Sequence, residues 1–150
     1  MEEYRKAVFI VTYAIEKEVI YYLLLKRKLH WKGWEFPKGG LEKNENLIDT
    51  IKRELKEETG LKPLKIKSFK IHGKYSYKKE YPERIGFIGQ SYSLYSAEVK
   101  KQKAKVDRRE HSNYKWFKFD KAVKKLTWGN QKKCLNIVND WLMEKDYERS

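Results

Sequence analysis

The 150-residue chain carries 35 Lys and Arg residues against 21 Asp and Glu, a formal net charge of +14, and one cysteine. This length predicts one domain, 1–150, with a full hydrophobic core, and excludes a second unit of similar size. The lone Cys134 excludes an internal disulfide, and no stretch approaches the roughly 20 apolar residues of a membrane span, so we expect a cytoplasmic protein without a membrane partner.

The first half of the chain predicts two strands, a loop and a helix. β-branched and aromatic runs at residues 7–13 and 19–26, separated by a polar Glu-Lys-Glu segment, indicate a strand pair. Residues 27–45 predict a long loop. A helix follows, with Asn44 as the expected N-cap and Gly60 at its end.

The second half predicts a sheet followed by two helices. Residues 65–71, 74–77, 84–88 and 90–99 have strand composition, with Gly73, Pro82 and Gly89 between them. Residues 114–119 predict one more strand, and residues 120–126 and 130–145 predict helices. The result is an α/β chain with a mixed sheet between helices.

Three carboxylates in the first helix indicate a metal site. Glu54, Glu57 and Glu58 are three and four residues apart, so they project from one side of a helix. Oxygen-only ligands suit Mg²⁺ or Mn²⁺ and leave positions open for phosphate oxygens. The alternative is an exposed Glu- and Lys-rich helix with ordinary i,i+4 ion pairs.

The segment around these acids resembles a known family. From Gly39 to Leu61 the chain follows G-x5-E-x7-R-E-L-x-E-E-x-G-L, which resembles the complete signature of the Nudix hydrolases. The preceding W-E-F-P-K-G-G run, residues 34–40, is similar to that of members cleaving dinucleoside polyphosphates or RNA 5′ ends. The resemblance implies a Nudix α/β/α sandwich with a mixed central sheet.

The resemblance also implies the metal ligands. These are the carboxylates of Glu54, Glu57 and Glu58, together with a backbone carbonyl near Lys38 or Gly39. A further acid is expected from the E-H-S-N-Y-K-W run that begins at residue 110, which resembles the segment where a downstream glutamate joins the metal site of related enzymes. Glu110 is the expected residue, and Glu98 is the competing candidate.

Five other residues have expected roles. Tyr77 lies where relatives acting on diadenosine polyphosphates carry a tyrosine, and its ring could stack on a nucleobase. Tyr75, on the same strand face, could serve instead. Lys38 and Arg27 are the expected polyphosphate contacts. Arg53 is expected to orient a carboxylate by bidentate pairing. The three histidines lack the spacing of a zinc site, so a structural role is expected for them.

The implied reaction is metal-assisted hydrolysis of a phosphoanhydride bond. Either Glu54 or Glu110 could remove the proton from the attacking water. The resemblance favours diadenosine tetraphosphate or a related dinucleoside polyphosphate as substrate. An RNA 5′ end, or a damaged nucleoside triphosphate, is the alternative.

The basic charge fits several interpretations. A charge of +14 attracts nucleoside polyphosphates or RNA. A charged fraction of 37%, dominated by Lys and Glu, is equally typical of a thermophile. A Nudix-fold RNA-binding module, without relevant catalysis, is the alternative from another class. We expect a monomer or a weak homodimer.

Overall fold

The computed structural model describes residues 3–78 and 84–149, which form one seven-stranded sheet and three helices. The elements in chain order are β1 Glu3–Glu16, β2 Val19–Arg27, β3 Gly33–Glu35, β4 Lys38–Gly40, α1 Leu47–Thr59, β5 Lys65–Ser76, β6 Phe87–Glu98, β7 His111–Phe117, α2 Phe119–Lys125 and α3 Gly129–Arg149.

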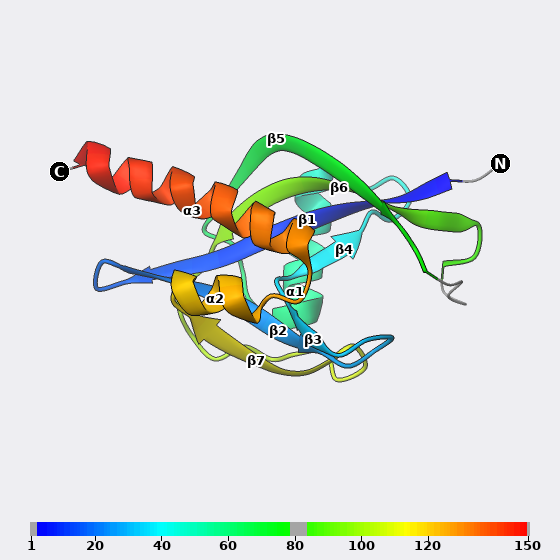
Figure 1. Ribbon diagram of the computed structural model, residues 1–150, viewed down its shortest axis with the longest axis horizontal. Helices are drawn as coiled ribbons and strands as arrows, with labels where there is room; N and C mark the ends of the chain where they lie inside the picture. Colours follow the sequence, from blue (N-terminus) through cyan, green and yellow to red (C-terminus); the bar gives the residue numbers. More distant parts are fainter. Residues whose placement is uncertain (1–2, 79–83, 150) are drawn as a thin grey trace.

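The sheet is mixed, as the sequence predicts. Its order is β3-β2-β1-β6-β5, with β4 added beside β1 and β7 beside β2. The pairing of β1 with β6 is parallel, and the other strand pairs are antiparallel. Figure 1 shows β1 crossing the middle of the molecule between β2 and β6.

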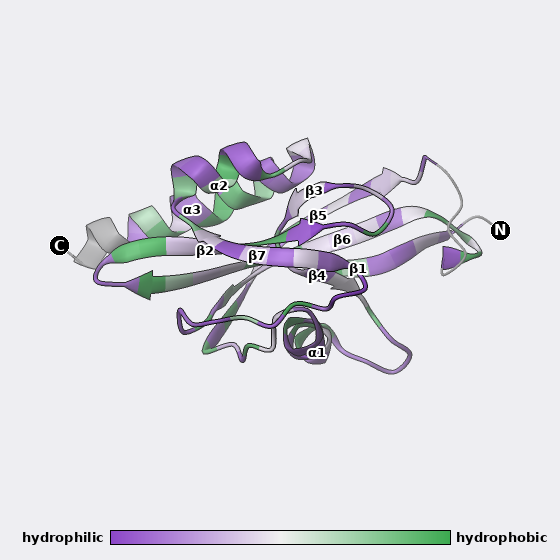
Figure 2. Cartoon of the chain, turned by 90° about the horizontal axis from the view of Figure 1, so that it is seen from below, coloured by the Kyte–Doolittle hydropathy of each residue, from purple (hydrophilic) through white to green (hydrophobic). Residues whose placement is uncertain are grey.

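Helices cover both faces of this sheet. Seen along the sheet in Figure 2, α1 lies on one side and α2 and α3 lie on the other. Alternate residues of β1 serve the two layers, because successive side chains of a strand point to opposite faces. Val8 and Ile10 pack with α1, whereas Phe9, Val11 and Tyr13 pack with α3. The α/β/α sandwich is therefore confirmed.

The splaying of β2 away from β1 creates the place where the site forms. β2 pairs with β1 only over Val19–Tyr22. Near its other end, the same edge of β1 is taken by β4, where Phe9 pairs with Lys38. The edge of β2 that β1 leaves pairs with β3 over Leu25–Arg27, while β7 pairs along the opposite edge and sets Arg27 opposite His111. Segments far apart in the sequence thus meet beside β4.

The helix α1 begins two residues later than the sequence suggests. The N-cap is Asn46, whose side-chain Oδ1 accepts a hydrogen bond from the Asp49 backbone N–H at 2.8 Å. Asn44 has a left-handed backbone, with φ 65°, in the turn before the helix. The expected cap at Asn44 is therefore wrong, because two asparagines stand close together and the turn uses the first one. Gly60 is the C-cap, as expected.

Other differences concern strands. The expected loop at residues 27–45 contains β3 and β4, each of three residues. The ranges expected to hold four strands between residues 65 and 99 form two long ones, β5 and β6. Gly73 does not end a strand, because a Cβ there would fall 2.3 Å from the ring of Tyr92, and glycine permits that close approach within the ladder. Arg84–Gly86 form a turn instead of a strand, and Pro82 lies outside the described residues.

The C-terminal elements are shifted by a few residues. β7 begins at His111 instead of residue 114, and Phe119 opens α2 instead of ending the strand. α3 extends at both ends beyond residues 130–145, and it buries Cys134, Leu135, Val138 and Leu142. Over the described part of the chain, no helix has the length and apolar character needed to cross a membrane.

Candidate functional site

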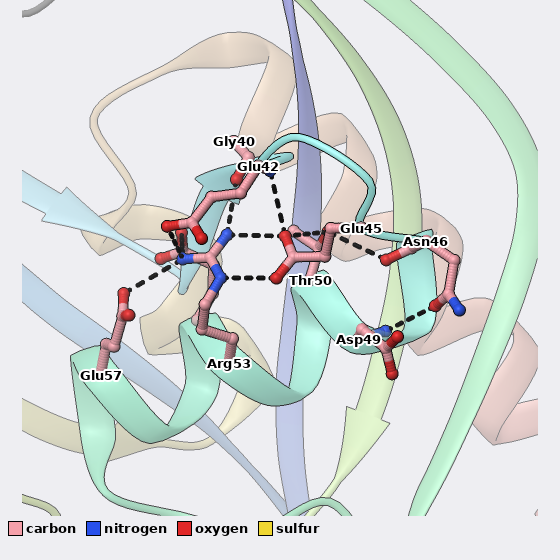
Figure 3. A network of polar contacts seen from close by, with 9 residues as sticks. Gly40, Glu42, Glu45, Asn46, Asp49, Thr50, Arg53 and Glu57 are labelled. Carbon is pink, nitrogen blue, oxygen red and sulfur yellow. Dashed lines mark hydrogen bonds and ion pairs between the residues drawn. The ribbon is translucent and has the colours of Figure 1, made fainter.

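Arg53 lies at the centre of a polar network that joins α1 to the segment before it (Figure 3). Its Nε and Nη2 donate to the two carboxylate oxygens of Glu45 at 2.7 and 2.9 Å, a bidentate pair. Its Nη1 donates to Glu54 at 2.8 Å and to Glu57 at 3.2 Å. Nη2 also donates to the Gly40 carbonyl at 2.8 Å. The guanidinium thus holds two of the three expected metal ligands in place.

Glu54 lies directly against β4. A Cβ placed on Gly39 would fall 2.0 Å from Cδ of Glu54, so only glycine lets the strand backbone come this close to the carboxylate. This approach brings the backbone near Lys38 and Gly39 beside an acid of α1. A carbonyl ligand from that segment, as the sequence analysis expects, remains a prediction.

Glu58 is buried and faces a different set of groups. Its Oε1 accepts a hydrogen bond from the Lys38 backbone N–H at 2.9 Å. Its Oε2 lies 3.9 Å from Nδ1 of His111, which opens β7. The three acids of α1 therefore do not meet at one neighbour: Glu54 and Glu57 share Arg53, and Glu58 faces β7.

Glu110 stands at the junction between these groups. One ligand atom from each of Glu58, Glu110 and His111 lies within 4.8 Å of the others, a spacing that could hold a metal ion. Glu110 also accepts from Arg27 Nη1 at 3.5 Å. The competing candidate, Glu98, instead accepts a hydrogen bond at 3.4 Å from Tyr13, beyond the part of β1 that pairs with β4.

Two acids of this group, Glu54 and Glu58, have a raised pKa. Burial raises the pKa of Glu54 to about 7, Arg53 opposes the shift, and the negative charges of Glu57 and Glu110 add to it. Burial also raises the pKa of Glu58 well above its usual value, and the charges of Glu54, Glu35 and Glu110 push it in the same direction. We call Glu54, Glu57, Glu58 and Glu110 the acidic cluster.

Glu35 is a fully buried acid with three cationic or donor neighbours. Its Oε2 lies 3.3 Å from Arg27 Nη1 and 2.8 Å from His111 Nε2, and its Oε1 lies 3.4 Å from Lys38 Nζ. Burial alone would raise the pKa of Glu35, but the charge of Lys38, the hydrogen bond from His111 and the charge of Arg27 together lower it to about 2. Glu35 is therefore an ionised carboxylate at neutral pH.

A cavity of about 530 Å³ opens beside this buried acid. This volume is within the range of small-molecule sites. Its described lining combines rings, cations and amides, and none of it is acidic: Phe9, Arg27, His30, Trp31, Lys38, Tyr75, Ser76, Tyr77, Lys78, Arg84, Trp128, Gly129, Asn130 and Gln131. We call it the aromatic cavity.

All four residues expected to bind substrate line this cavity. Tyr75 and Tyr77 meet edge to face with ring centroids 6.3 Å apart, and Tyr75 donates its hydroxyl hydrogen to Gln90. Lys38 and Arg27 line the same space, although both also pair with Glu35. Arg27 is only 4% exposed, so it is a fixed charge at the wall.

Several residues of the site were not expected from the sequence. Glu35 ends the three-residue strand β3 and lies between Trp34 and Phe36 in the sequence. An acid between two aromatic residues is the signal that could have singled it out. His111, expected to be structural, contacts two acids of the site. Trp31 and Trp128 meet edge to face at 5.1 Å in the cavity wall, but they are more than 90 residues apart in the sequence and no local pattern connects them.

Comparison with known proteins gives matches over most of the chain. A family model described as the NUDIX domain matches residues 3–136. An 8-oxo-dGTP diphosphatase from Buchnera aphidicola is 36% identical over 107 residues, which cover 71% of this chain and 72% of that protein. An RNA pyrophosphohydrolase from Thioalkalivibrio sulfidiphilus is 43% identical over 44 residues, a quarter of each chain.

A solved structure has the same fold at lower identity. The Ap4A hydrolase of C. elegans, in a binary complex, superposes with a TM-score of 0.73 at 22% identity. The match covers 93% of this chain and 98% of that one. At this identity the likeness concerns the fold alone.

Proposed function

The chain belongs to the NUDIX hydrolase family, and from this premise we propose that it is a Mg²⁺- or Mn²⁺-dependent pyrophosphohydrolase of nucleoside polyphosphates. The observation that carries the proposal is that Lys38 belongs to both halves of the site. Its backbone N–H holds Glu58 of the acidic cluster at 2.9 Å, and its side chain lines the aromatic cavity. A base in the cavity would therefore send its phosphate chain past Lys38 toward the acids.

The residues of the acidic cluster fit a divalent cation. The negative charges of Glu57 and Glu110 contribute to the raised pKa of Glu54, so the ionised carboxylates repel, and a bound cation would remove that repulsion. Glu54, Glu57, Glu58 and Glu110 would hold the ion, with a backbone carbonyl near Lys38 or Gly39. When bound, Mg²⁺ or Mn²⁺ neutralises phosphate charge and lowers the pKa of a coordinated water.

Proton removal falls to an acid of the same cluster. Glu54 is one candidate for the general base, because a bound cation would keep its carboxylate ionised and able to accept a proton. Arg53 donates to Glu54 at 2.8 Å and keeps its carboxylate turned toward β4. Glu110, with a side chain 35% exposed, is the second candidate for the base. Arg53 acts as a positioning residue in either case.

The aromatic cavity supports a purine nucleotide as substrate. Rings of Tyr75, Tyr77, Trp31 and Trp128 offer faces and edges on which a base can stack, and stacking is worth roughly 1–3 kcal/mol per base. Arg27 and Lys38 supply fixed positive charge for phosphates. We propose diadenosine tetraphosphate or a related dinucleoside polyphosphate as the leading substrate.

A damaged purine nucleoside triphosphate is the second candidate. Similarity to an 8-oxo-dGTP diphosphatase over most of the chain favours it. So do two cavity amides, Asn130 and Gln131, whose buried side-chain oxygens have no hydrogen-bond partner among the described residues. Such oxygens suit the N–H groups of a base. An RNA 5′ end is a further alternative, and it would rely more on the net charge of +14.

The single cysteine indicates the cellular setting. The thiol of Cys134 is buried and unpaired, which suits a reducing compartment such as the cytoplasm. We infer a single domain over residues 1–150, acting as a monomer or a weak homodimer. An RNA-binding module without catalysis would have no need of an intact acidic cluster.

Hydrolysis of a small substrate panel with Mg²⁺ tests the proposal. The panel contains diadenosine tetraphosphate, 8-oxo-dGTP, 5′-triphosphorylated RNA, ADP-ribose and ordinary nucleoside triphosphates. We expect the highest kcat/KM for diadenosine tetraphosphate, and no turnover with excess chelator. A preference for 8-oxo-dGTP would establish the second candidate. Absence of turnover on every substrate with Mg²⁺ and with Mn²⁺ would refute the enzyme assignment and leave the RNA-binding module.

A further inference from the structure

We propose that His111 is a nitrogen ligand of the metal site, beside Glu58 and Glu110, and that it makes the site prefer Mn²⁺ and Co²⁺ over Mg²⁺. The inference rests on the proposed function, because it concerns the same acidic cluster. It adds a ligand of another chemical type, from β7, to a set otherwise made of oxygen atoms.

The first support is an unmatched nitrogen. His111 is 0% exposed, and its Nδ1 has no hydrogen-bond partner among the described residues. Oε2 of Glu58 lies 3.9 Å from Nδ1, which is too far for a hydrogen bond. Buried nitrogens are nearly always paired in folded proteins. A histidine with a purely structural role would leave this one uncompensated, whereas a metal ion between Nδ1 and Glu58 would satisfy both.

The second support is the contact made by the other ring nitrogen. Nε2 lies 2.8 Å from Oε2 of Glu35, which also pairs with Arg27 and Lys38. An ionised carboxylate can only accept, so Nε2 carries the hydrogen and donates it. In the uncharged tautomer, which is the form that binds a metal ion, the lone pair is then on Nδ1, which faces the acidic cluster. Metal-bound histidines commonly donate their other N–H to a carboxylate in this way.

The third support is the spacing of the three side chains. The ligand atoms of Glu58, Glu110 and His111 lie within 4.8 Å of one another. Two ligands on opposite sides of an ion, each at roughly 2.0–2.6 Å, are about 4–5 Å apart. The backbone holds this arrangement, because Lys38 N–H fixes Glu58 and the β2–β7 pairing fixes His111 opposite Arg27.

A nitrogen ligand changes which ions the site holds best. Mg²⁺ is a hard ion that favours oxygen, and it gains little from an imidazole. Divalent transition metals bind nitrogen more readily, with affinity rising from Mn²⁺ to Co²⁺. We expect the wild-type protein to bind Mn²⁺ at least about tenfold more tightly than Mg²⁺, with the difference reduced when the nitrogen is removed.

The decisive measurement uses Mn²⁺ and the unmodified protein. Electron spin-echo envelope modulation of protein with less than one equivalent of Mn²⁺ should show coupling to nitrogen, and protein labelled with ¹⁵N-histidine should shift that signal. The coupling should disappear in His111→Gln and persist in His72→Gln, a matched control whose ring pairs with Ser93 on the far sheet edge. Competition of Mg²⁺ against Mn²⁺ should show reduced preference in His111→Gln alone.

The outcomes separate this proposal from the proposed function. Nitrogen coupling without hydrolysis of any panel substrate would support His111 as a metal ligand and refute the proposed enzymatic activity. Hydrolysis with Mn²⁺ but without nitrogen coupling in wild-type protein would support the enzymatic activity and show that His111 is not a metal ligand. A failure to bind Mn²⁺ at all would also overturn the ligand. If His111→Gln folds poorly, ¹⁵N-histidine coupling that persists in both His30→Gln and His72→Gln would still identify His111, because the chain has three histidines.

Discussion

The acidic cluster and the aromatic cavity adjoin at Lys38 but have opposite electrostatic character. In the acidic cluster, burial and neighbouring negative charges raise the pKa of Glu54 to about 7, and they raise the pKa of Glu58 well above its usual value. The described lining of the aromatic cavity has rings and fixed cations, and no acid. We therefore expect one side to bind cations and the other to bind flat, anionic molecules.

The difference separates chemistry from recognition. A change in the acidic cluster should lower kcat, because the groups there act on the reacting phosphate. A change in the aromatic cavity should raise KM, because the contacts there are equally strong before and during reaction. Glu35 stands between the two, since it pairs with Arg27 and Lys38 of the cavity and with His111 of the metal side. Substitutions can therefore perturb each of these three regions separately.

Glu35→Gln should have the largest effect, and it should act on stability. The change leaves Arg27 and Lys38 buried without their main counter-charge, which typically costs about 3–5 kcal/mol. Because the pKa of Glu35 is lowered to about 2, its contribution is complete above its ordinary value of 4.5 and is lost as pH falls toward 2. Urea unfolding at about pH 7 and about pH 3.5 should show a large gap that narrows in acid.

A matched control for this variant is Glu16→Gln. Glu16 is half exposed and pairs with Lys101 at 3.9 Å, so its loss should change the free energy of unfolding by less than about 0.5 kcal/mol. If Glu35→Gln has the same free energy of unfolding as the wild type at neutral pH, the ion pairs of Glu35 with Arg27 and Lys38 do not stabilise the fold.

Glu57→Gln and Glu58→Gln test the acidic side. Each keeps the volume of the side chain and removes one charge, so kcat should fall at least roughly a hundredfold with little change in KM or fold. Glu42→Gln is the control, because Glu42 also pairs with Arg53, at 3.5 Å, but lies outside α1. Steady-state kinetics at saturating Mg²⁺ measure the effect. Wild-type turnover in both variants would refute the proposed metal ligands.

Tyr77→Ala tests the aromatic side. If the ring stacks on a base, KM for diadenosine tetraphosphate should rise by roughly 5- to 150-fold, from a loss of about 1–3 kcal/mol, with kcat nearly unchanged. Tyr77→Phe keeps the ring and should stay close to wild type. For 5′-triphosphorylated RNA the effect should be smaller, and binding should weaken steeply with salt. An unchanged KM for diadenosine tetraphosphate would favour RNA as substrate.

The smallest effect should come from Glu54→Gln without metal. A raised pKa means that the folded state binds the proton more tightly than the unfolded state, so wild-type stability should fall as pH rises from 4.5 to about 7. Above that range Glu54→Gln should be more stable by about 1 kcal/mol, after the lost pairing with Arg53 is subtracted. Urea unfolding with chelator at two pH values measures this.

Adding Mg²⁺ should make the wild type more stable than Glu54→Gln. Metal binding stabilises only the folded state, and the wild type should bind it more tightly. If Glu54→Gln is no more stable than wild type in chelator at high pH, repulsion within the acidic cluster does not weaken the fold.

Much of the fold was accessible from local sequence patterns. Hydrophobic periodicity and the positions of glycine and proline predict the α/β class, the mixed sheet, the end of α1 at Gly60 and the two C-terminal helices. The patterns failed where tertiary contacts determine whether a segment forms a strand. β3 and β4 are too short to give a periodic signal, and they exist because β2 and β1 offer free edges. Gly73 resembles a strand break in sequence, but the ring of Tyr92 requires glycine there.

The site was accessible to a lesser degree. The spacing in α1 singled out Glu54, Glu57 and Glu58, but it could not show that Arg53 and His111 divide them between two neighbours. Glu35 and His111 are 76 residues apart in sequence and 2.8 Å apart in space. That pairing depends on the register of β2 with β7, which no local pattern encodes. Their roles as metal or substrate ligands remain predictions.

The parallel pairing of β1 with β6 has a consequence for how the chain folds during synthesis. The paired residues are separated by more than half of the chain, and β2, β3, β4, α1 and β5 all lie between them. Closing so long a loop is slow, because its entropy must be lost before the contacts form. Glu110 and His111 leave the ribosome later still. A nascent chain therefore carries the acids of α1 for some time without the strand that completes their surroundings, and competence to hold a metal ion arrives late.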